Sequence, residues 1–139
     1  MPLVVDASVV VKWFLTEAFS EHAARVLRGP HHLMAPDLLW AETASVLWKR
    51  CRRDELSIGT TRRVLHDLLA YSIATVPHRG LLGQALLLAA RLDHPPYDCL
   101  YLALAEQQGC PLVSADRRLR DALLRASLGH RMLWIEDVP

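Results

Sequence analysis

The chain has 139 residues, of which 52% are hydrophobic and 22% are charged, and its formal net charge at pH 7 is +1. This composition fits a folded domain with a sizeable core and excludes an intrinsically disordered chain. A net charge so close to zero provides no global basic field, so any nucleic-acid binding has to come from local patches.

Predicted strands and helices alternate along the chain. The first apolar run, Leu3 to Val5, is typical of a strand that is buried on both faces. We expect Ser8 to cap the helix that follows it. The remaining pattern predicts strands at 33–35, 73–76, 112–114 and 132–135, and helices at 9–15, 21–27, 37–53, 57–71, 81–92, 97–107 and 116–126. This alternation favours an α/β fold with a parallel sheet between helices, and the 81–92 helix, apolar almost all round, is expected to be buried.

The cysteines and the apolar runs indicate a cellular compartment. Cys51, Cys99 and Cys110 show no Cys-x-x-Cys spacing and leave an odd thiol, which favours a reducing compartment over a disulfide framework. We see no signal peptide, and the longest apolar run, 81–92, is too short to span a bilayer. We therefore expect a cytoplasmic protein that forms a single domain over residues 1–139 and does not contact a membrane.

Four carboxylates occupy unusual places in this pattern. Asp6 and Asp116 follow predicted strands, Asp98 stands in the first turn of a helix, and Glu42 lies among leucines inside the long helix. Each has an ordinary explanation, because Asp is a preferred helix cap and suits a helix N-terminus, and Glu42 could pair with Lys49 or an arginine. For any one of the three aspartates alone, capping is the more common role, whereas for Glu42 the two explanations are about even.

Taken together, the four carboxylates predict a metal site. The carboxyl ends of parallel strands share one edge of a sheet, which is where ligands bind in open α/β folds. Like charges that lie close together raise one another's pKa or require a cation, and Mg²⁺ and Mn²⁺ prefer carboxylate and water ligands. Such ions activate water for phosphodiester hydrolysis. Ser114, two residues before Asp116, offers a hydroxyl that could orient a carboxylate or a water.

Four segments carry a resemblance to a known family: residues 3–8, 41–47, 97–105 and 112–119. They resemble the acidic motifs of PIN-domain nucleases, and in particular those of VapC-type toxins of toxin–antitoxin pairs. The resemblance covers nearly the whole chain and implies an α/β PIN-like fold, with about five parallel strands in the order 3-2-1-4-5. It also implies a Mg²⁺- or Mn²⁺-dependent endoribonuclease that leaves a 5′-phosphate and a 3′-hydroxyl, an inhibitory antitoxin partner, and commonly a homodimer.

The resemblance assigns roles to individual residues. Asp6, Glu42, Asp98 and Asp116 take the four acidic positions of the family, which are catalytic and bind the metal, and Ser114 takes its Ser/Thr position. Some relatives carry a further acidic residue shortly after the fourth carboxylate, where this chain has Arg117 and Arg118. A second metal is then expected to bind weakly, or only when RNA phosphate supplies ligands. Because Arg117 and Arg118 flank Asp116, we regard them as candidate RNA contacts.

Several alternatives stay open. The chain could be a non-catalytic RNA- or protein-binding module of the same fold, whose carboxylates cap helices or hold a structural ion. A phosphate-handling receiver domain is less well supported, because Ala7 and Ser8 follow Asp6 where a second acidic residue is wanted. The predicted role of the tryptophans is core packing, with a groove for an antitoxin helix as the alternative; these residues are Trp13, Trp40 and Trp48. The histidines show no metal-ligand spacing, and we expect surface or loop roles for His31, His32 and His94.

Overall fold

The computed structural model describes residues 2–139, in which five parallel strands form one sheet in the order β3-β2-β1-β4-β5. This confirms the α/β class and the strand order that the resemblance implied. The strands are β1 (Pro2–Val5), β2 (His32–Pro36), β3 (Ala74–Val76), β4 (Leu112–Ser114) and β5 (Met132–Trp134).

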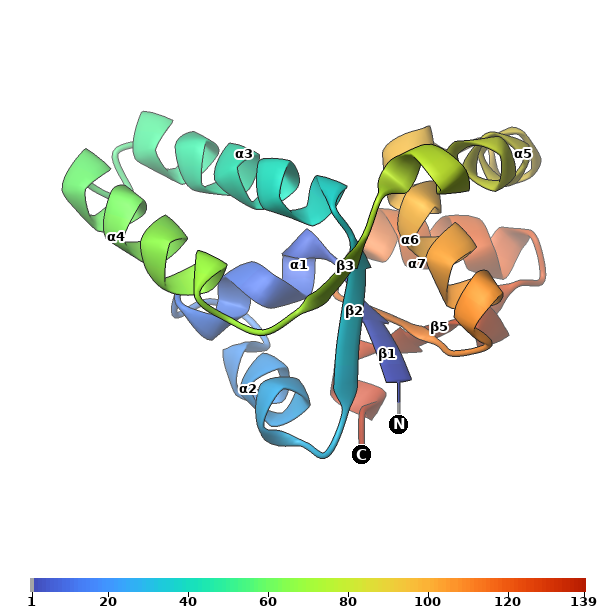
Figure 1. Cartoon of the computed structure of the whole chain (residues 1–139), viewed down its shortest axis with the longest axis horizontal. Helices are drawn as coiled ribbons and strands as arrows, with labels where there is room; N and C mark the ends of the chain where they lie inside the picture. The colour runs from blue at the N-terminus through green and yellow to red at the C-terminus, as the bar shows by residue number, and fades with distance from the viewer. Residues whose placement is uncertain (1) are drawn as a thin grey trace.

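Helices connect the strands, and each predicted helix is present with small shifts at its ends. Figure 1 shows α3 and α4 projecting together on one side of the strands, and α5, α6 and α7 gathered on the other. Within residues 2–139, no helix is long and apolar enough to cross a membrane. The helices are α1 (Ala7–Val10), α2 (Ser20–Arg28), α3 (Leu38–Arg52), α4 (Ile58–Leu69), α5 (Leu82–Leu92), α6 (Pro96–Gln108) and α7 (Arg117–Arg125), with short 3₁₀ turns η1 (Val11–Trp13), η2 (His78–Leu81), η3 (Gly129–Arg131) and η4 (Ile135–Asp137).

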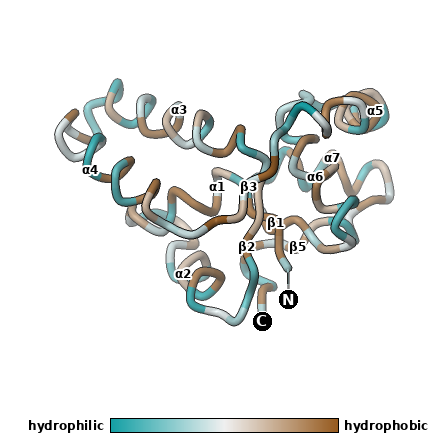
Figure 2. Tube along the Cα trace, viewed as in Figure 1, coloured by the Kyte–Doolittle hydropathy of each residue, from teal (hydrophilic) through white to brown (hydrophobic). Residues whose placement is uncertain are grey.

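The core lies between the central strand β1 and helix α6. Leu3, Val4 and Val5 of β1 are fully buried, and every residue from Cys99 to Ala105 of α6 is buried as well. Figure 2 shows hydrophobic residues concentrated at the centre of the molecule, where the strands lie. Burying each large apolar side chain contributes about 2 kcal/mol, so this packing holds the first turn of α6 firmly beside the end of β1.

Helix α5 is not buried all round, contrary to the expectation for residues 81–92. Ala85, Leu88 and Leu92 are buried, but Leu86 and Leu87 are about two-thirds exposed. The cause is position, because α5 packs on the outer side of α6 and only one of its faces has a partner. A leucine-rich helix therefore keeps an apolar face exposed to water. Exposed apolar faces of this kind commonly mark binding surfaces.

The first helix also begins earlier than we expected. Asp6, not Ser8, is the N-cap of α1, and its side chain accepts a hydrogen bond from the backbone N–H of Val9 at 3.3 Å. The chain turns directly into the helix after β1, so Ser8 falls within the first helical turn. This places the Asp6 carboxylate, rather than a hydroxyl, at the carboxyl end of the central strand.

A charged triplet ties the segment after α1 to helix α3. Glu17 accepts hydrogen bonds from Lys12 at 2.8 Å and from Arg50 at 2.5 Å. Burial acts to raise the pKa of Glu17, but the hydrogen bonds and charges of Lys12 and Arg50 outweigh it and hold the pKa below its usual value. The triplet thereby fixes α3, the helix that carries Glu42, against the N-terminal part of the fold.

We predict that Glu17→Gln lowers the free energy of unfolding by about 1 kcal/mol at pH 7. Because the pKa of Glu17 is lower in the folded than in the unfolded chain, its contribution is present above the unfolded pKa of about 4.5 and is lost as the pH falls through the folded pKa. Urea denaturation of the wild type and the variant between pH 7 and pH 3 measures this. Glu21→Gln, at an exposed position on α2, is the control. A difference between wild type and Glu17→Gln that does not shrink in acid would contradict the prediction.

Candidate active site

The sheet brings the predicted acidic residues to one edge. Val5 of β1 pairs with Val113 of β4, so Asp6 lies level with Ser114 at the carboxyl ends of neighbouring strands. Asp116 is the N-cap of α7, Asp98 lies in the first turn of α6, and Glu42 lies in the second turn of α3. Four elements far apart in the sequence therefore present carboxylates to the same edge of the fold.

Two serine hydroxyls hold the buried carboxylate of Asp6. Ser8 Oγ donates to Oδ1 at 2.5 Å and Ser114 Oγ donates to Oδ2 at 2.5 Å. The same hydroxyls also accept hydrogen bonds from the turn that follows β4. Ala115 N–H donates to Ser8 Oγ at 3.0 Å, and Asp116 N–H donates to Ser114 Oγ at 3.0 Å. This network joins the turn after β1 to the turn after β4, so the position of Asp6 depends on both.

Within residues 2–139, no basic side chain forms an ion pair with Asp6. Burial raises its pKa most; the hydrogen bonds from Ser114 and Ser8 lower it, and the charges of Asp98 and Asp116 raise it further, to about 7. This repulsion indicates that the carboxylates of Asp98 and Asp116 both lie near that of Asp6. A bound cation would relieve both the burial cost and the repulsion.

Glu42 is held by a tyrosine rather than by the basic residue that we considered. Tyr101 Oη donates to Glu42 Oε1 at 2.5 Å, and the structure places neither Lys49 nor an arginine in an ion pair with Glu42 within residues 2–139. Burial raises the pKa of Glu42, the tyrosine hydrogen bond lowers it, and the charge of Asp98 raises it. Burial and the charges of Glu42, Asp6 and Asp98 raise the pKa of Tyr101 strongly, so the hydroxyl stays protonated as a donor.

Sequence reasoning missed Tyr101 and His94. Tyr101 lies three residues after Asp98 on one helix, a spacing that places both on the same face and could have identified it. His94 lies in the loop between α5 and α6, which is one of the two roles that we expected, but its side chain is only 9% exposed and its Nε2 lies 2.6 Å from Asp98 Oδ2. Sequence reasoning could not predict this contact, because the proline pair between His94 and Asp98 breaks the predicted helix. The rule that residues four apart lie on the same helix face therefore does not apply to them.

Asp116 caps α7 and also belongs to the acidic group. Its Oδ1 accepts from the backbone N–H of Arg118 at 2.9 Å and of Leu119 at 3.4 Å, which is the capping role that Asp commonly plays. Its charge nevertheless acts on Asp6. Arg117 and Arg118 are exposed on the first turn of α7, beside this carboxylate.

The four carboxylates have the chemistry and charge that suit a hard divalent ion, but they are not arranged as a coordination sphere. Within residues 2–139, no three His, Cys, Asp or Glu side chains form a group that could hold a metal ion as they stand. Each carboxylate instead has its own hydrogen-bond donors: two serines for Asp6, Tyr101 for Glu42, His94 for one oxygen of Asp98, and the backbone N–H of Arg118 for Asp116. Metal binding would therefore require the carboxylates to move closer together, at an edge whose backbone is already in place.

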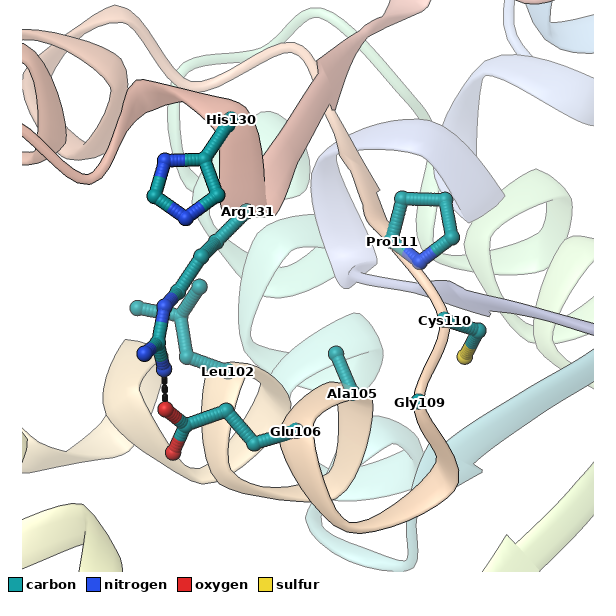
Figure 3. Close-up of a pocket in the computed structure, with 8 residues that line it drawn as sticks. All are labelled: Leu102, Ala105, Glu106, Gly109, Cys110, Pro111, His130 and Arg131. Atoms are coloured by element: carbon teal, nitrogen blue, oxygen red, sulfur yellow. Dashed lines mark ion pairs between the residues drawn. The ribbon is translucent and has the colours of Figure 1, made fainter.

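A surface cavity of about 590 Å³ lies elsewhere, where β4 and β5 begin (Figure 3). Its lining includes Cys110, Pro111 and His130, and an ion pair between Arg131 and Glu106 crosses one side of it. None of the four predicted acidic residues lines this cavity. It opens at the amino ends of the strands, opposite the acidic edge, and is not part of the candidate site.

Comparison with known proteins gives consistent matches over most of the chain. A family model described as the PIN domain matches residues 3–122. Ribonuclease VapC3 of Pyrobaculum aerophilum is 35% identical over 123 residues, which cover 87% of this chain and 94% of that protein. Ribonuclease VapC9 of Mycobacterium tuberculosis is 35% identical over 119 residues, which cover 86% of this chain and 89% of that protein.

Two solved structures share the fold. The PAE2754 protein of Pyrobaculum aerophilum has a TM-score of 0.70 at 23% identity, over 98% of this chain and 85% of that one. VapC20 of Mycobacterium tuberculosis, a toxin that cleaves the sarcin–ricin loop, has a TM-score of 0.64 at 19% identity, over 81% of this chain and 86% of that one. At these identities the likeness establishes the common fold alone.

We predict that Asp6→Asn changes how the metal-free protein responds to pH. The folded wild type binds an extra proton between the unfolded pKa of about 3.8 and the folded pKa of about 7, so its stability falls as the pH rises through this interval. The variant cannot ionise. Between pH 5 and pH 8 the stability difference should therefore move in favour of Asp6→Asn by about 2 kcal/mol.

Urea denaturation with a chelator present at both pH values measures this difference. Asp121→Asn, at an exposed position on the same α7 that Asp116 caps, should show no such pH dependence. A constant difference between wild type and Asp6→Asn would mean that the Asp6 carboxylate ionises without cost in the folded protein.

Proposed function

Because this chain belongs to the PIN-domain family, we propose that it is a metal-dependent endoribonuclease of the VapC type, which hydrolyses RNA phosphodiester bonds. The observation that carries the proposal is the buried Asp6, whose pKa is raised by burial and by the charges of Asp98 and Asp116 at the same sheet edge. Perturbed carboxylates gathered in this way are typical of sites that bind divalent ions and catalyse.

We assign Asp6, Glu42, Asp98 and Asp116 the role of holding Mg²⁺ or Mn²⁺. When bound, the ion would supply Lewis-acid activation of water and stabilise charge on the phosphate oxygens. The protein's own contribution is orientation, because the hydroxyls of Ser8 and Ser114 fix Asp6 and the hydroxyl of Tyr101 fixes Glu42. Ser114 thus acts through Asp6 and through the backbone of Asp116.

Arg117 and Arg118 are the proposed contacts to RNA. Both are exposed and follow Asp116 directly, so a phosphate that approaches the acidic edge meets two guanidinium groups. With a net charge of only +1, the chain has no other source of long-range attraction than such local groups. These cations also offset the repulsion between the carboxylates and the phosphate backbone.

The proposed antitoxin partner would bind the groove between α3 and α4. An apolar cavity of about 200 Å³ lies there, lined by Leu47, Trp48, Ile58 and Leu65 among others. Trp48 and Ile58 are exposed, and the Arg52 guanidinium lies over the Trp48 ring at 5.4 Å. An apolar groove with a cationic rim suits an amphipathic helix with acidic flanks.

The proposed homodimer would bury the exposed face of α5. Leu82, Leu86 and Leu87 are exposed there, and Tyr97 at the start of α6 is exposed as well. A second copy that packs the same face against this one would remove all four side chains from water, as a two-fold interface does.

A non-catalytic binding module is the second candidate. The capping of α1 by Asp6 and of α7 by Asp116 favours it, because these carboxylates have a structural role that does not require a metal. This alternative predicts that loss of a carboxylate changes stability but removes no catalytic activity.

We predict that Asp98→Asn lowers the rate of RNA cleavage at least about 100-fold, because the neutral amide is a poor ligand for a hard cation. The assay compares total RNA treated with purified wild type and variant in Mn²⁺, with chelator in parallel. Asp121→Asn is the matched control, and circular dichroism checks the fold of each variant. Cleavage by Asp98→Asn at the wild-type rate would remove Asp98 from the mechanism, and metal-independent cleavage would overturn the proposal.

We predict that Leu86→Glu converts a dimer into a monomer, because it places charges in the centre of the proposed α5 interface. Light scattering coupled to gel filtration measures the mass. Leu124→Glu, at an exposed leucine of α7, should leave the mass unchanged. A Leu86→Glu protein that keeps the wild-type mass would place the dimer interface elsewhere.

A further inference from the structure

We propose that His94 is a positioning residue that holds the Asp98 carboxylate toward the acidic edge and thereby sets the affinity of the site for a divalent cation. The inference rests on the proposed function and deepens it, because it assigns a role to a residue outside the four carboxylates. It is drawn from the geometry of the segment that joins α5 to α6.

The contact between the two side chains is short and partly buried. His94 Nε2 lies 2.6 Å from Asp98 Oδ2, and the two side chains are 9% and 30% exposed. Because a carboxylate oxygen accepts hydrogen bonds, we assign the hydrogen to Nε2, which makes His94 the donor. Within residues 2–139, Oδ1 of Asp98 has no hydrogen-bond partner, so one oxygen is anchored while the other stays available for a ligand.

The backbone around His94 is fixed by its neighbours. Asp93 ends α5 in the left-handed conformation at φ 49°, and the His94 N–H donates to the carbonyl of Ala89 at 3.2 Å. Pro95 and Pro96 follow, and their rings restrict the chain that leads into α6. The restricted backbone therefore positions the imidazole next to Asp98. Because the connection is rigid, forming the hydrogen bond costs little conformational entropy.

The two other histidine–aspartate pairs found within residues 2–139 lack these properties. His78 lies 2.7 Å from Asp37, but the two side chains are 44% and 43% exposed. His66 and Asp67 are 3.5 Å apart and still more exposed. Of these pairs, only that of His94 includes a carboxylate whose charge acts on Asp6 and Glu42.

The physical need for an anchor comes from repulsion. Asp98 faces the charges of Asp6 and Glu42, and a free carboxylate on the first turn of a helix would relieve that repulsion by rotating toward water. A hydrogen bond to a fixed, nearly buried donor opposes the rotation. Removing such an outer partner typically lowers metal affinity about 10- to 100-fold, and a loss of this size is what we expect here.

The test is a double-mutant cycle on Mn²⁺ affinity, followed by the electron paramagnetic resonance signal of free Mn²⁺. The proteins are wild type, His94→Ala, Asp98→Asn and the double variant. His94→Gln adds a conservative replacement, because its amide nitrogen can occupy the place of Nε2 and donate. His66→Ala breaks the exposed pair on α4 and serves as the matched control, and thermal melts report the stability of every variant.

We expect His94→Ala to weaken Mn²⁺ binding about tenfold or more, His94→Gln to recover most of the loss, and His66→Ala to bind as the wild type does. In the Asp98→Asn background, His94→Ala should cause no further loss, which a merely structural role for His94 would not produce. Wild-type affinity in His94→Ala, or equal losses in both backgrounds, would overturn this inference and leave the proposed function standing. A wild type that binds no Mn²⁺ would overturn the proposed function itself and this inference with it.

Discussion

Repulsion between carboxylates at one edge of the sheet is the constraint on which the rest of the structure depends. Asp6 is buried and faces the charges of Asp98 and Asp116, and Glu42 faces Asp98 as well. Folding places these groups together at a cost, since charges of the same sign in a poorly solvated place destabilise the folded state. Hydrogen-bond donors reduce that cost at all four groups, and we propose that a divalent cation removes the remainder.

The parallel sheet makes this arrangement possible. Its central strands β1 and β4 end side by side, so the turns that follow them must share space, and serine hydroxyls from both turns close on one carboxylate. The buried helix α6 brings Asp98 and Tyr101 to the same place from the other direction. Glu42 arrives on α3, which the ion pairs of Glu17 hold in position. The site is therefore made of short-range contacts between elements that the core has already ordered.

The acidic positions could be predicted from the sequence, and the strand order from the resemblance to PIN-domain nucleases. The hydrogen-bond partners of the acidic side chains could not. Tyr101 and Glu42 are 59 residues apart, and no periodicity links them. The His94 contact crosses a proline break, where helix spacing does not apply. The exposed face of α5 was missed for a different reason: a helix that is apolar all round carries no pattern to say which face is covered, and only the packing against α6 decides it.

The most direct test of the proposed metal site is a crystal of the protein soaked in Mn²⁺ and measured at the manganese absorption edge. Anomalous scattering locates the ion without assumptions about its ligands. We predict a peak at the carboxyl edge of the sheet, within about 2–2.5 Å of oxygens from at least two of Asp6, Glu42, Asp98 and Asp116. A peak elsewhere on the protein, or none in a crystal that diffracts well at saturating Mn²⁺, would contradict the claim that these carboxylates form a metal site.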